Sequence, residues 1–264
     1  MSELLTYLET TFNSLGWLSN FFGIVIPLVG IPSSIYGLYK YRMVIFGTPS
    51  FAKLTKTQIE TTWNGKETIR KIAEVAIVDD RPSDFPTTEL QQAGYNVKTY
   101  KQVSLKDIAR LAEYDVLFLD IHGIVKDDID EGGLKLLPKL RDANSRQKIC
   151  AVSSKTFDPT ATEFFKQADD VQKKPVNAQK CQDVIDTLAL EKLGPNALAA
   201  ELDNETKNLG IYKRRILLGQ VRKFAATSKP FSEVPVHITA AGKPSLALNH
   251  MLMDYTRVLR NAIS

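Results

Sequence analysis

The segment Val75-Ala76-Ile77-Val78-Asp79-Asp80 is a short apolar run, rich in β-branched residues, that ends directly in two aspartates. Two later segments repeat this pattern, because residues 116–119 precede Asp120 and residues 149–152 precede Ser153. Runs of this kind are typical of strands that are buried on both faces of a parallel sheet. The stretches between them are long enough for crossover helices. The sequence therefore predicts an α/β domain with a parallel sheet.

The polar residues that follow the apolar runs are expected at one edge of the sheet, because ligand sites lie beyond the carboxyl ends of parallel strands. A carboxylate is a usable nucleophile toward phosphorus, and phosphoryl transfer depends mainly on positioning and charge neutralisation. Three clustered carboxylates repel one another unless a cation lies among them, and Mg²⁺ suits that place. The pattern predicts a phosphoacceptor aspartate site made of Asp79, Asp80, Asp120, Ser153 and Lys174.

Residues 75–188 resemble the receiver domain of bacterial two-component response regulators. The resemblance implies a doubly wound, five-stranded parallel sheet of the flavodoxin-like receiver type, which we place at residues 74–188. It also implies Mg²⁺-dependent phosphorylation by a histidine kinase or another phosphodonor, which would switch the conformation and the output of the protein. The segments that carry the resemblance occur in the order of the family: VAIVDD, AGYNVKTY, YDVLFLDI, GGLKLL, ICAVSS and KKP.

The resemblance implies a role for each acidic residue of the site. Asp120 would accept the phosphoryl group and would also be a ligand of the metal. Asp80 would bind Mg²⁺ directly, with Asp79 helping mostly through water. The backbone carbonyl of His122 would complete the protein ligands of Mg²⁺.

The resemblance also implies roles for a hydroxyl and an amine. Ser153 would bond a phosphoryl oxygen, and Lys174 would pair first with Asp120 and then with the phosphate. The peptide bond before Pro175 is expected to be cis. The only catalysis expected is the phosphotransfer and dephosphorylation of the protein itself.

The chain departs from the family pattern near the site. Pro82 and Pro86 fall where the first helix of the family usually begins, so we expect that helix to be short or to start late. The loop after Asp120 is longer than the family's loop and lacks its Met-Pro pair. Val171 stands where many receivers carry a switching aromatic residue, which argues against an aromatic relay.

Two other interpretations use the same residues. The string from Leu119 to Val125 resembles the first motif of haloacid-dehalogenase-type phosphatases, which also use a nucleophilic aspartate. The second aspartate of that motif, a general acid, is His122 here, and the acidic pair precedes the nucleophile strand, so we favour the receiver. A pseudo-receiver, in which the site only binds another protein, stays open.

Residues 21–39 carry no charge and are long enough to cross a hydrocarbon core of about 30 Å. We predict a single transmembrane helix there, kinked at Pro27 and Pro32, while a re-entrant hairpin stays open. Lys40 and Arg42 follow the span and no basic residue precedes it. The N-terminus is therefore expected outside an inner (cytoplasmic) membrane, with the sheet domain in the cytoplasm. A membrane-disrupting effector of the antiviral defence type, triggered through the receiver-like part, is a third interpretation.

Length and composition suit a division into four parts. A chain of 264 residues, 44% of them hydrophobic, can hold an anchor, one sheet domain and a smaller additional part. Cys150 and Cys181 lack metal-ligand spacing and are expected to be free thiols. The parts are an N-terminal segment with the span (1–42), a helical or partly helical connector (43–73), the receiver-like domain (74–188) and a mostly helical region of unknown output (189–264).

The C-terminal region contains a basic stretch between residues 207 and 229. A basic helix near a bilayer could lie against anionic lipid, although a solvated helix face is the simpler interpretation. The net charge of +4 is mild and no helix-turn-helix signature is visible, so nucleic acid is not an expected partner. The basic residues are Lys207, Lys213, Arg214, Arg215, Arg222, Lys223 and Lys229.

Two elements are predicted near the C-terminus. Residues 234–239 suit an edge strand. A helix is expected to open at Pro244-Ser245 and to carry apolar residues at four-three spacing. That stripe suits either a homo-oligomer, formed through this helix or the transmembrane helix, or packing against its own domain. Its residues are Leu248, Leu252, Tyr255, Leu259 and Ala262.

Overall fold

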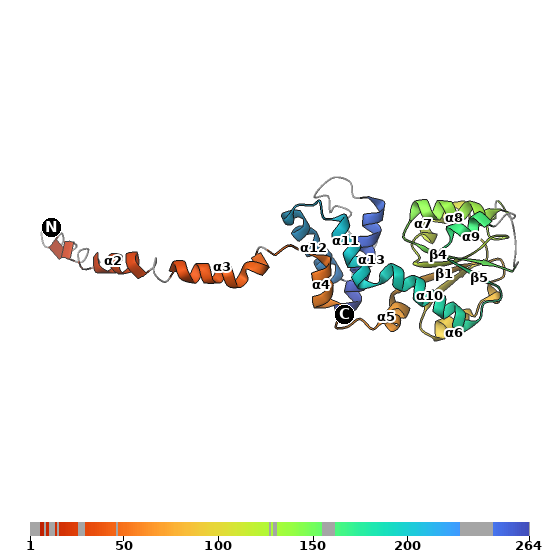
Figure 1. Ribbon diagram of the computed structural model, residues 1–264, viewed down its shortest axis with the longest axis horizontal. Coiled ribbons are helices and arrows are strands. Elements are labelled where there is room, and N and C mark those ends of the chain that lie inside the picture. Colours follow the sequence, from red (N-terminus) through yellow and green to blue (C-terminus); the bar gives the residue numbers. More distant parts are fainter. Residues whose placement is uncertain are drawn as a thin grey trace. The chain divides into compact units, whose positions relative to one another are not determined.

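The computed structural model describes residues 6–7, 9–10, 14, 16–25, 30–45, 47–126, 128, 131–154, 162–227 and 245–263. These residues belong to two compact units, Met1–Thr48 and Pro49–Ser264. Figure 1 shows the helices and strands of each unit.

Among the described residues of the first unit lie α2 (Gly16–Val25) and α3 (Ile31–Ile45). Among the described residues, no helix is both long enough and apolar enough to cross a membrane. The predicted spanning helix over residues 21–39 is therefore not supported by the described residues, and residues 26–29 lie outside them. Pro32 lies in the first turn of α3, where a missing amide costs no hydrogen bond, so the sequence favours a helix start at this place.

The second unit contains a five-stranded sheet in which all neighbouring strands run parallel. The strand order β2-β1-β3-β4-β5 confirms the predicted α/β class and the doubly wound parallel sheet. In this order the crossover after β1 leads to β2 on one side and the crossover after β3 leads to β4 on the other, which makes the carboxyl ends of β1 and β3 the expected place for a ligand. The strands are β1 (Glu74–Val78), β2 (Asn96–Tyr100), β3 (Val116–Asp120), β4 (Lys148–Ser153) and β5 (Asp170–Lys173).

Alternate side chains of each buried strand point to opposite faces of the sheet, and both sets are apolar. Both faces are therefore covered by helices. Ala76, Leu117 and Ile149 face one hydrophobic cluster, and Val75, Val116 and Cys150 face the other. On the first face lie α7 (Ile108–Leu111), α8 (Gly132–Ala143) and α9 (Thr162–Gln167); on the second lie α6 (Thr87–Gln92) and α10 (Ala178–Leu193) (Figure 1).

The connection after β1 has the form that its two prolines predict. A 3₁₀ turn, η2 (Pro82–Asp84), comes first, and α6 begins only at Thr87 and has six residues. Pro82 occupies the first position of η2, where its missing amide is harmless. The expected short, late first helix is confirmed. A second 3₁₀ turn, η3 (Leu105–Asp107), leads into α7.

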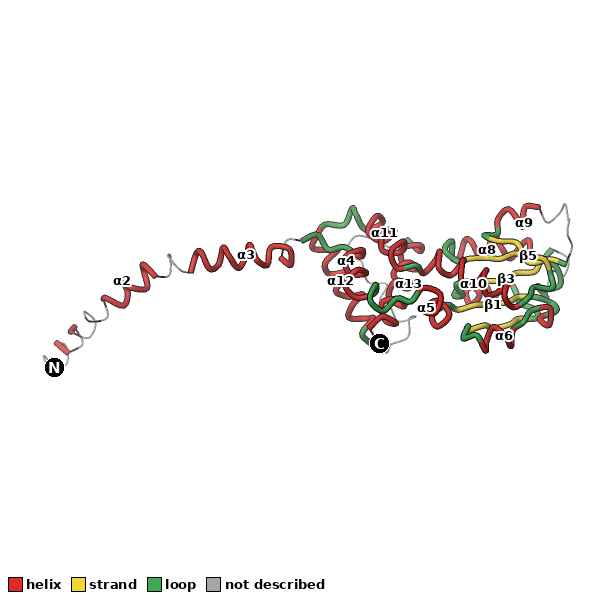
Figure 2. The backbone as a smooth tube through the Cα atoms, turned by 60° about the horizontal axis from the view of Figure 1, so that its bottom comes forward, coloured by secondary structure: helices red, strands yellow, loops and turns green. Residues whose placement is uncertain are grey.

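The remaining helices of the second unit pack together beside α10 (Figure 2). They share one continuous hydrophobic cluster with the α10 face of the sheet, so the predicted boundaries after residues 73 and 188 fall inside one core. Both hydrophobic clusters lie within residues 49–264, which therefore carry a complete core of their own. These helices are α4 (Phe51–Gln58), α5 (Gly65–Ile72), α11 (Pro195–Glu205), α12 (Ile211–Ala225) and α13 (Leu246–Ile263).

The apolar stripe of the last helix packs inside its own domain. Leu252, Tyr255 and Leu259 are buried, and α13 contacts α4, α11 and α12. The Tyr255 hydroxyl lies 2.9 Å from that of Thr55, which ties the last helix to the first helix of the unit. The stripe is thus not available for a second chain. The predicted edge strand at residues 234–239 lies outside the described residues.

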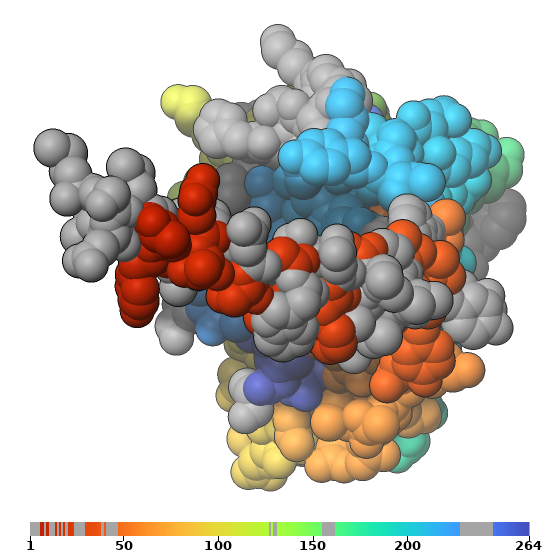
Figure 3. All heavy atoms as spheres, turned by 90° about the vertical axis from the view of Figure 1, so that its left-hand side faces the viewer, coloured from red at the N-terminus to blue at the C-terminus, as the bar shows by residue number. Residues whose placement is uncertain are grey.

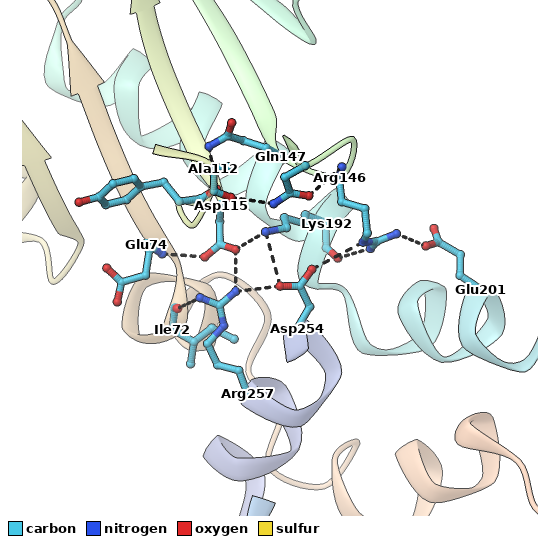
Figure 4. Close-up of polar contacts among 12 residues, drawn as sticks. Ile72, Glu74, Ala112, Asp115, Arg146, Gln147, Lys192, Glu201, Asp254 and Arg257 are labelled. Atoms are coloured by element: carbon cyan, nitrogen blue, oxygen red, sulfur yellow. Dashed lines mark hydrogen bonds and ion pairs between the residues drawn. The ribbon is translucent and has the colours of Figure 1, made fainter. Parts of the chain in front are cut away.

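A buried ionic network joins the amino edge of the sheet to the helices (Figure 4). Asp115, which precedes β3, is fully buried and accepts hydrogen bonds at 2.6 Å from both Lys192 Nζ and Arg257 Nη2. Its other oxygen accepts a bond from the Glu74 amide at 2.8 Å. Asp254 lies 3.5 Å from Lys192, 3.1 Å from Arg257 and 3.6 Å from Arg146, which also pairs with Glu201, so three acidic and three basic groups balance each other. The network connects β1 and β3 with α10 and α13. 

Candidate functional site

The strand ends bring the polar residues predicted from the sequence to one edge of the sheet. Asp79 and Asp80 follow β1 directly, and Asp120 and Ser153 are the last residues of β3 and β4. Lys174 follows β5 in the same way. Because all five strands are parallel, these residues belong to the carboxyl edge, which is opposite to the edge that carries Asp115.

The three aspartates form a group that could hold a metal ion. One carboxylate oxygen from each of Asp79, Asp80 and Asp120 lies within 4.8 Å of those of the other two. Asp79 is fully buried and Asp120 is 7% exposed, whereas the side chain of Asp80 is 42% exposed. Mg²⁺ prefers hard oxygen ligands and usually keeps several waters, so a carboxylate cluster open to solvent on one side fits this ion.

Lys174 supplies a buried positive charge inside the cluster. Its Nζ lies 2.5 Å from Asp120 Oδ2 and 2.5 Å from Asp79 Oδ2. The contact with Asp120 matches the pairing expected from the sequence, whereas the ion pair with Asp79 was not expected. Burial acts to lower the pKa of Lys174, but the carboxylates of Asp120 and Asp79 outweigh it and raise the pKa above its usual range. Three carboxylates and one ammonium leave a formal charge of −2, which a divalent cation would neutralise.

Backbone amides hold two of the carboxylates in place. The Arg81 amide donates to Asp79 Oδ1, and the Ile121 amide donates to Asp120 Oδ1, both at 2.8 Å. Burial raises the pKa of Asp79 above its usual range, against the opposing effects of Lys174 and the Arg81 amide. The Arg81 side chain extends over the rim, with Nε 3.9 Å from Asp80 and 3.7 Å from Asp84. The two amide contacts could not be predicted from the sequence, because every residue except proline has a backbone amide.

Two glycines allow close approach of the backbone to the site. Gly123 has a φ of +75°, which favours glycine, and a Cβ there would lie 3.0 Å from Asp80 Cβ. A Cβ on Gly133, in the first turn of α8, would lie 2.4 Å from the carbonyl oxygen of Asp120. The Gly133 amide also donates to the Ile121 carbonyl at 3.0 Å. The Gly132-Gly133 pair at the helix start is the sequence signal for this approach.

The loop after Asp120 is held against the segment that follows β2. Ile124 and Val125 are fully buried in the loop. The Val103 amide donates to the Ile124 carbonyl at 2.8 Å, and the Lys126 amide donates to the Val103 carbonyl at 3.1 Å. The long loop expected from the sequence is therefore anchored as far as Lys126. His122 lies half-buried in this loop, between β3 and Gly123.

The last two strands complete the rim. Ser153 is buried, and its carbonyl accepts a hydrogen bond from the Lys174 amide at 3.0 Å. The Lys174–Pro175 peptide is cis, as predicted. Val171, an aliphatic residue, is 45% exposed on β5. Cys150 and Cys181 are buried free thiols, as expected, and burial raises the pKa of both.

A scan against protein-family models and a search of curated proteins found no match. Solved structures similar to this chain include three receiver domains. The BeF3-activated DrrB receiver domain is 21% identical, covers 44% of this chain and 97% of its own, and has a TM-score of 0.36. The receiver domain of a Francisella response regulator is 21% identical, over 44% of this chain and 96% of its own, with a TM-score of 0.37. A CheY-like receiver domain protein from Methanospirillum hungatei is 22% identical, over 46% and 98%, with a TM-score of 0.36.

Proposed function

We propose that this protein is a response-regulator-like switch whose receiver domain is phosphorylated on Asp120. One observation carries the proposal: at the carboxyl edge of the sheet, Lys174 Nζ lies 2.5 Å from both Asp79 and Asp120 within a cluster of three aspartates. A nucleophilic carboxylate beside a fixed ammonium group and further acidic ligands suits phosphoryl transfer, which needs positioning and charge neutralisation.

Each residue of the site has a task in this proposal. Asp120 Oδ1 is held by the Ile121 amide, and an oxygen of this carboxylate would attack the phosphorus atom as the bond to the donor breaks, releasing the imidazole of a phosphohistidine or the carboxylate of an acyl phosphate. The ammonium of Lys174, which pairs with the Asp120 carboxylate, would pair with the phosphoryl oxygens after the transfer. Ser153, at the end of the next strand, would donate its hydroxyl to one of these oxygens. The role of His122 would be to present its backbone carbonyl to the metal.

Mg²⁺ would be held by Asp80, Asp120 and the His122 carbonyl, with Asp79 acting mostly through water. When bound, the ion would neutralise charge on the transferred phosphoryl group. The half-exposed carboxylate of Asp80 leaves a path by which a hydrated ion and a phosphodonor could enter from solvent. The proposed phosphodonor is a histidine kinase or a small acyl phosphate.

Phosphorylation would act by shifting a balance between two existing states, which requires the phosphorylated site to favour one of them. The loop from Ile121 to Lys126 connects the site to the segment after β2, and α8 begins directly behind it, so these segments would carry the change. Location at the inner membrane through residues 21–39 is a second proposal. Extraction of membranes at alkaline pH would test it, because an integral segment stays in the pellet.

The phosphorylation proposal is tested on residues 49–264, which carry a complete core. The fragment is incubated with Mg²⁺ and acetyl phosphate, and its intact mass is measured. We expect one phosphoryl adduct that is lost in Asp120→Asn and kept in Asp142→Asn, an exposed aspartate on α8. Absence of an adduct under conditions that label a known receiver would contradict phosphorylation and favour a pseudo-receiver that only binds a partner.

A further inference from the structure

Helix α12 has one buried and one exposed side. Its 15 residues include five basic residues and no acidic one. Leu217, Val221 and Phe224 are buried against the rest of the domain. Figure 3 shows the light-blue spheres of α12 at the surface of the second unit. We call the exposed side the outer face of α12; it comprises Ile211, Tyr212, Lys213, Arg215, Ile216 and Lys223.

The outer face combines apolar and basic side chains. Tyr212 is 77% exposed and Ile216, one turn later, is 39% exposed. At the helical repeat of 3.6 residues, Lys223 and Arg215 lie beside these two residues on the same side. Exposure of a large aromatic and an isoleucine side by side is unfavourable in water, so this surface suits a partner that takes up apolar groups between positive charges.

The start of α12 is tied to the place where the chain continues toward residues 1–48. Asp203, at the end of α11, accepts hydrogen bonds from the Phe51 and Ala52 amides at 2.8 and 3.1 Å. The same carboxylate lies 2.5 Å from Arg214 Nη2 in the first turn of α12. One carboxylate therefore joins the first turns of α4 and α12.

We propose that the outer face of α12 binds the surface of a bilayer that contains anionic lipids. Tyrosine and isoleucine would enter the headgroup region, while the basic side chains would reach lipid phosphates on either side. Nucleic acid fits less well, because phosphate contacts need the basic groups but provide nothing for Ile211 and Ile216. This inference goes beyond the phosphorylation of Asp120 and does not depend on it.

The test measures binding of residues 49–264 to sedimenting vesicles. One set of vesicles is phosphatidylcholine alone, and the other includes phosphatidylserine. We expect binding only to the anionic set, weakened by salt. The variant Lys213→Gln/Lys223→Gln should bind about thirtyfold more weakly, because each of the two basic residues near such a surface contributes about 1 kcal/mol, and about 1.4 kcal/mol corresponds to a factor of ten. Tyr212→Ser/Ile216→Ser should also lose binding.

Control variants carry changes of the same kind away from α12. Lys101→Gln/Lys139→Gln removes two exposed lysines of the sheet domain, and Leu190→Ser removes an exposed leucine of α10; both should bind like the unchanged fragment. Absence of binding to anionic vesicles, or equal losses in the controls, would overturn the proposal. Tighter retention by duplex DNA or RNA, lost in the α12 variants, would assign the face to nucleic acid instead. The fragment lacks residues 1–48, so the outcome is separate from the proposed anchor and from phosphorylation.

Discussion

Lys174 holds one ammonium group between two carboxylates that are almost completely buried. Taking these charges out of water is costly, and the ammonium offsets that cost only while it stays in place. The residue therefore has a structural task in addition to its proposed part in phosphotransfer.

We expect Lys174→Ala to lower the free energy of unfolding by about 3 kcal/mol at neutral pH without metal, because it leaves buried carboxylates without their cation. Mg²⁺ should recover a larger share of stability in this variant than in the unchanged fragment. Urea unfolding with a chelator and with Mg²⁺ measures both effects. If Mg²⁺ stabilises both proteins equally, the ion does not bind among these carboxylates.

Gly133 tests how closely α8 must approach the site. Its substitution by alanine would place a Cβ 2.4 Å from the Asp120 carbonyl and 2.6 Å from the Ile121 carbonyl. We expect a loss of about 1–3 kcal/mol in unfolding free energy, since buried backbone must move. Gly219→Ala is the matched control, because nothing lies within 4 Å of a Cβ there, and alanine should gain up to about 1 kcal/mol in a helix. The two urea midpoints should move in opposite directions.

At the scale of elements, the Asp115 network attaches α10 and α13 to the amino edge of the sheet. Burial acts to raise the pKa of Asp115, but the charges of Arg257 and Lys192 outweigh it and lower the pKa to about 2. The pKa of an aspartate in the unfolded chain is about 3.9. The contribution of the ionised Asp115 carboxylate to the free energy of unfolding is therefore fully present above about pH 4 and is lost as the pH falls through about 2.

Asp115→Asn should lower the free energy of unfolding by about 3 kcal/mol at neutral pH, because it leaves Lys192 and Arg257 with only the carboxylate of Asp254, which Arg146 also contacts. The difference from the unchanged fragment should shrink as the pH falls below about 4, since protonation removes the same charge. Asp183→Asn, on the exposed side of α10, serves as the control and should change stability by less than about 0.5 kcal/mol. A difference that stays constant down to the acid limit would contradict an ionic origin.

At the scale of the molecule, one hydrophobic cluster runs from the α10 face of the sheet through all five additional helices. We expect residues 49–264 to unfold in a single transition, because no part can separate without exposing this cluster. Trp63, the one tryptophan in this fragment, packs against the cluster in the helical part, whereas Cys150 lies buried in β4.

Trp63 fluorescence and Cys150 thiol labelling should therefore report the same urea midpoint. Cys181→Ala removes the other thiol, so both probes are measured in this variant. Two separate midpoints would mean that the sheet domain and the helices unfold independently.

The aspartate cluster illustrates what local sequence contains. Each strand is short and buried on both faces, so its apolar run, and the polar residue that ends it, can be read without knowledge of the neighbours. Parallel order then brings the ends together. The contact of Lys174 with Asp79, by contrast, depends on side-chain positions across strands that are not adjacent in the sheet.

The sequence by itself determined the parallel sheet, the edge at which the acidic residues gather, and the short helix after Pro82, because each of these follows from patterns within a few residues. Only the tertiary structure decided that α13 returns to pack on α4 and that Asp115 joins it to the sheet. An apolar stripe indicates that one side of a helix is buried, but it does not identify the element that packs against it. The ionic partners of a buried charge lie far away in the sequence, so local patterns do not reveal them.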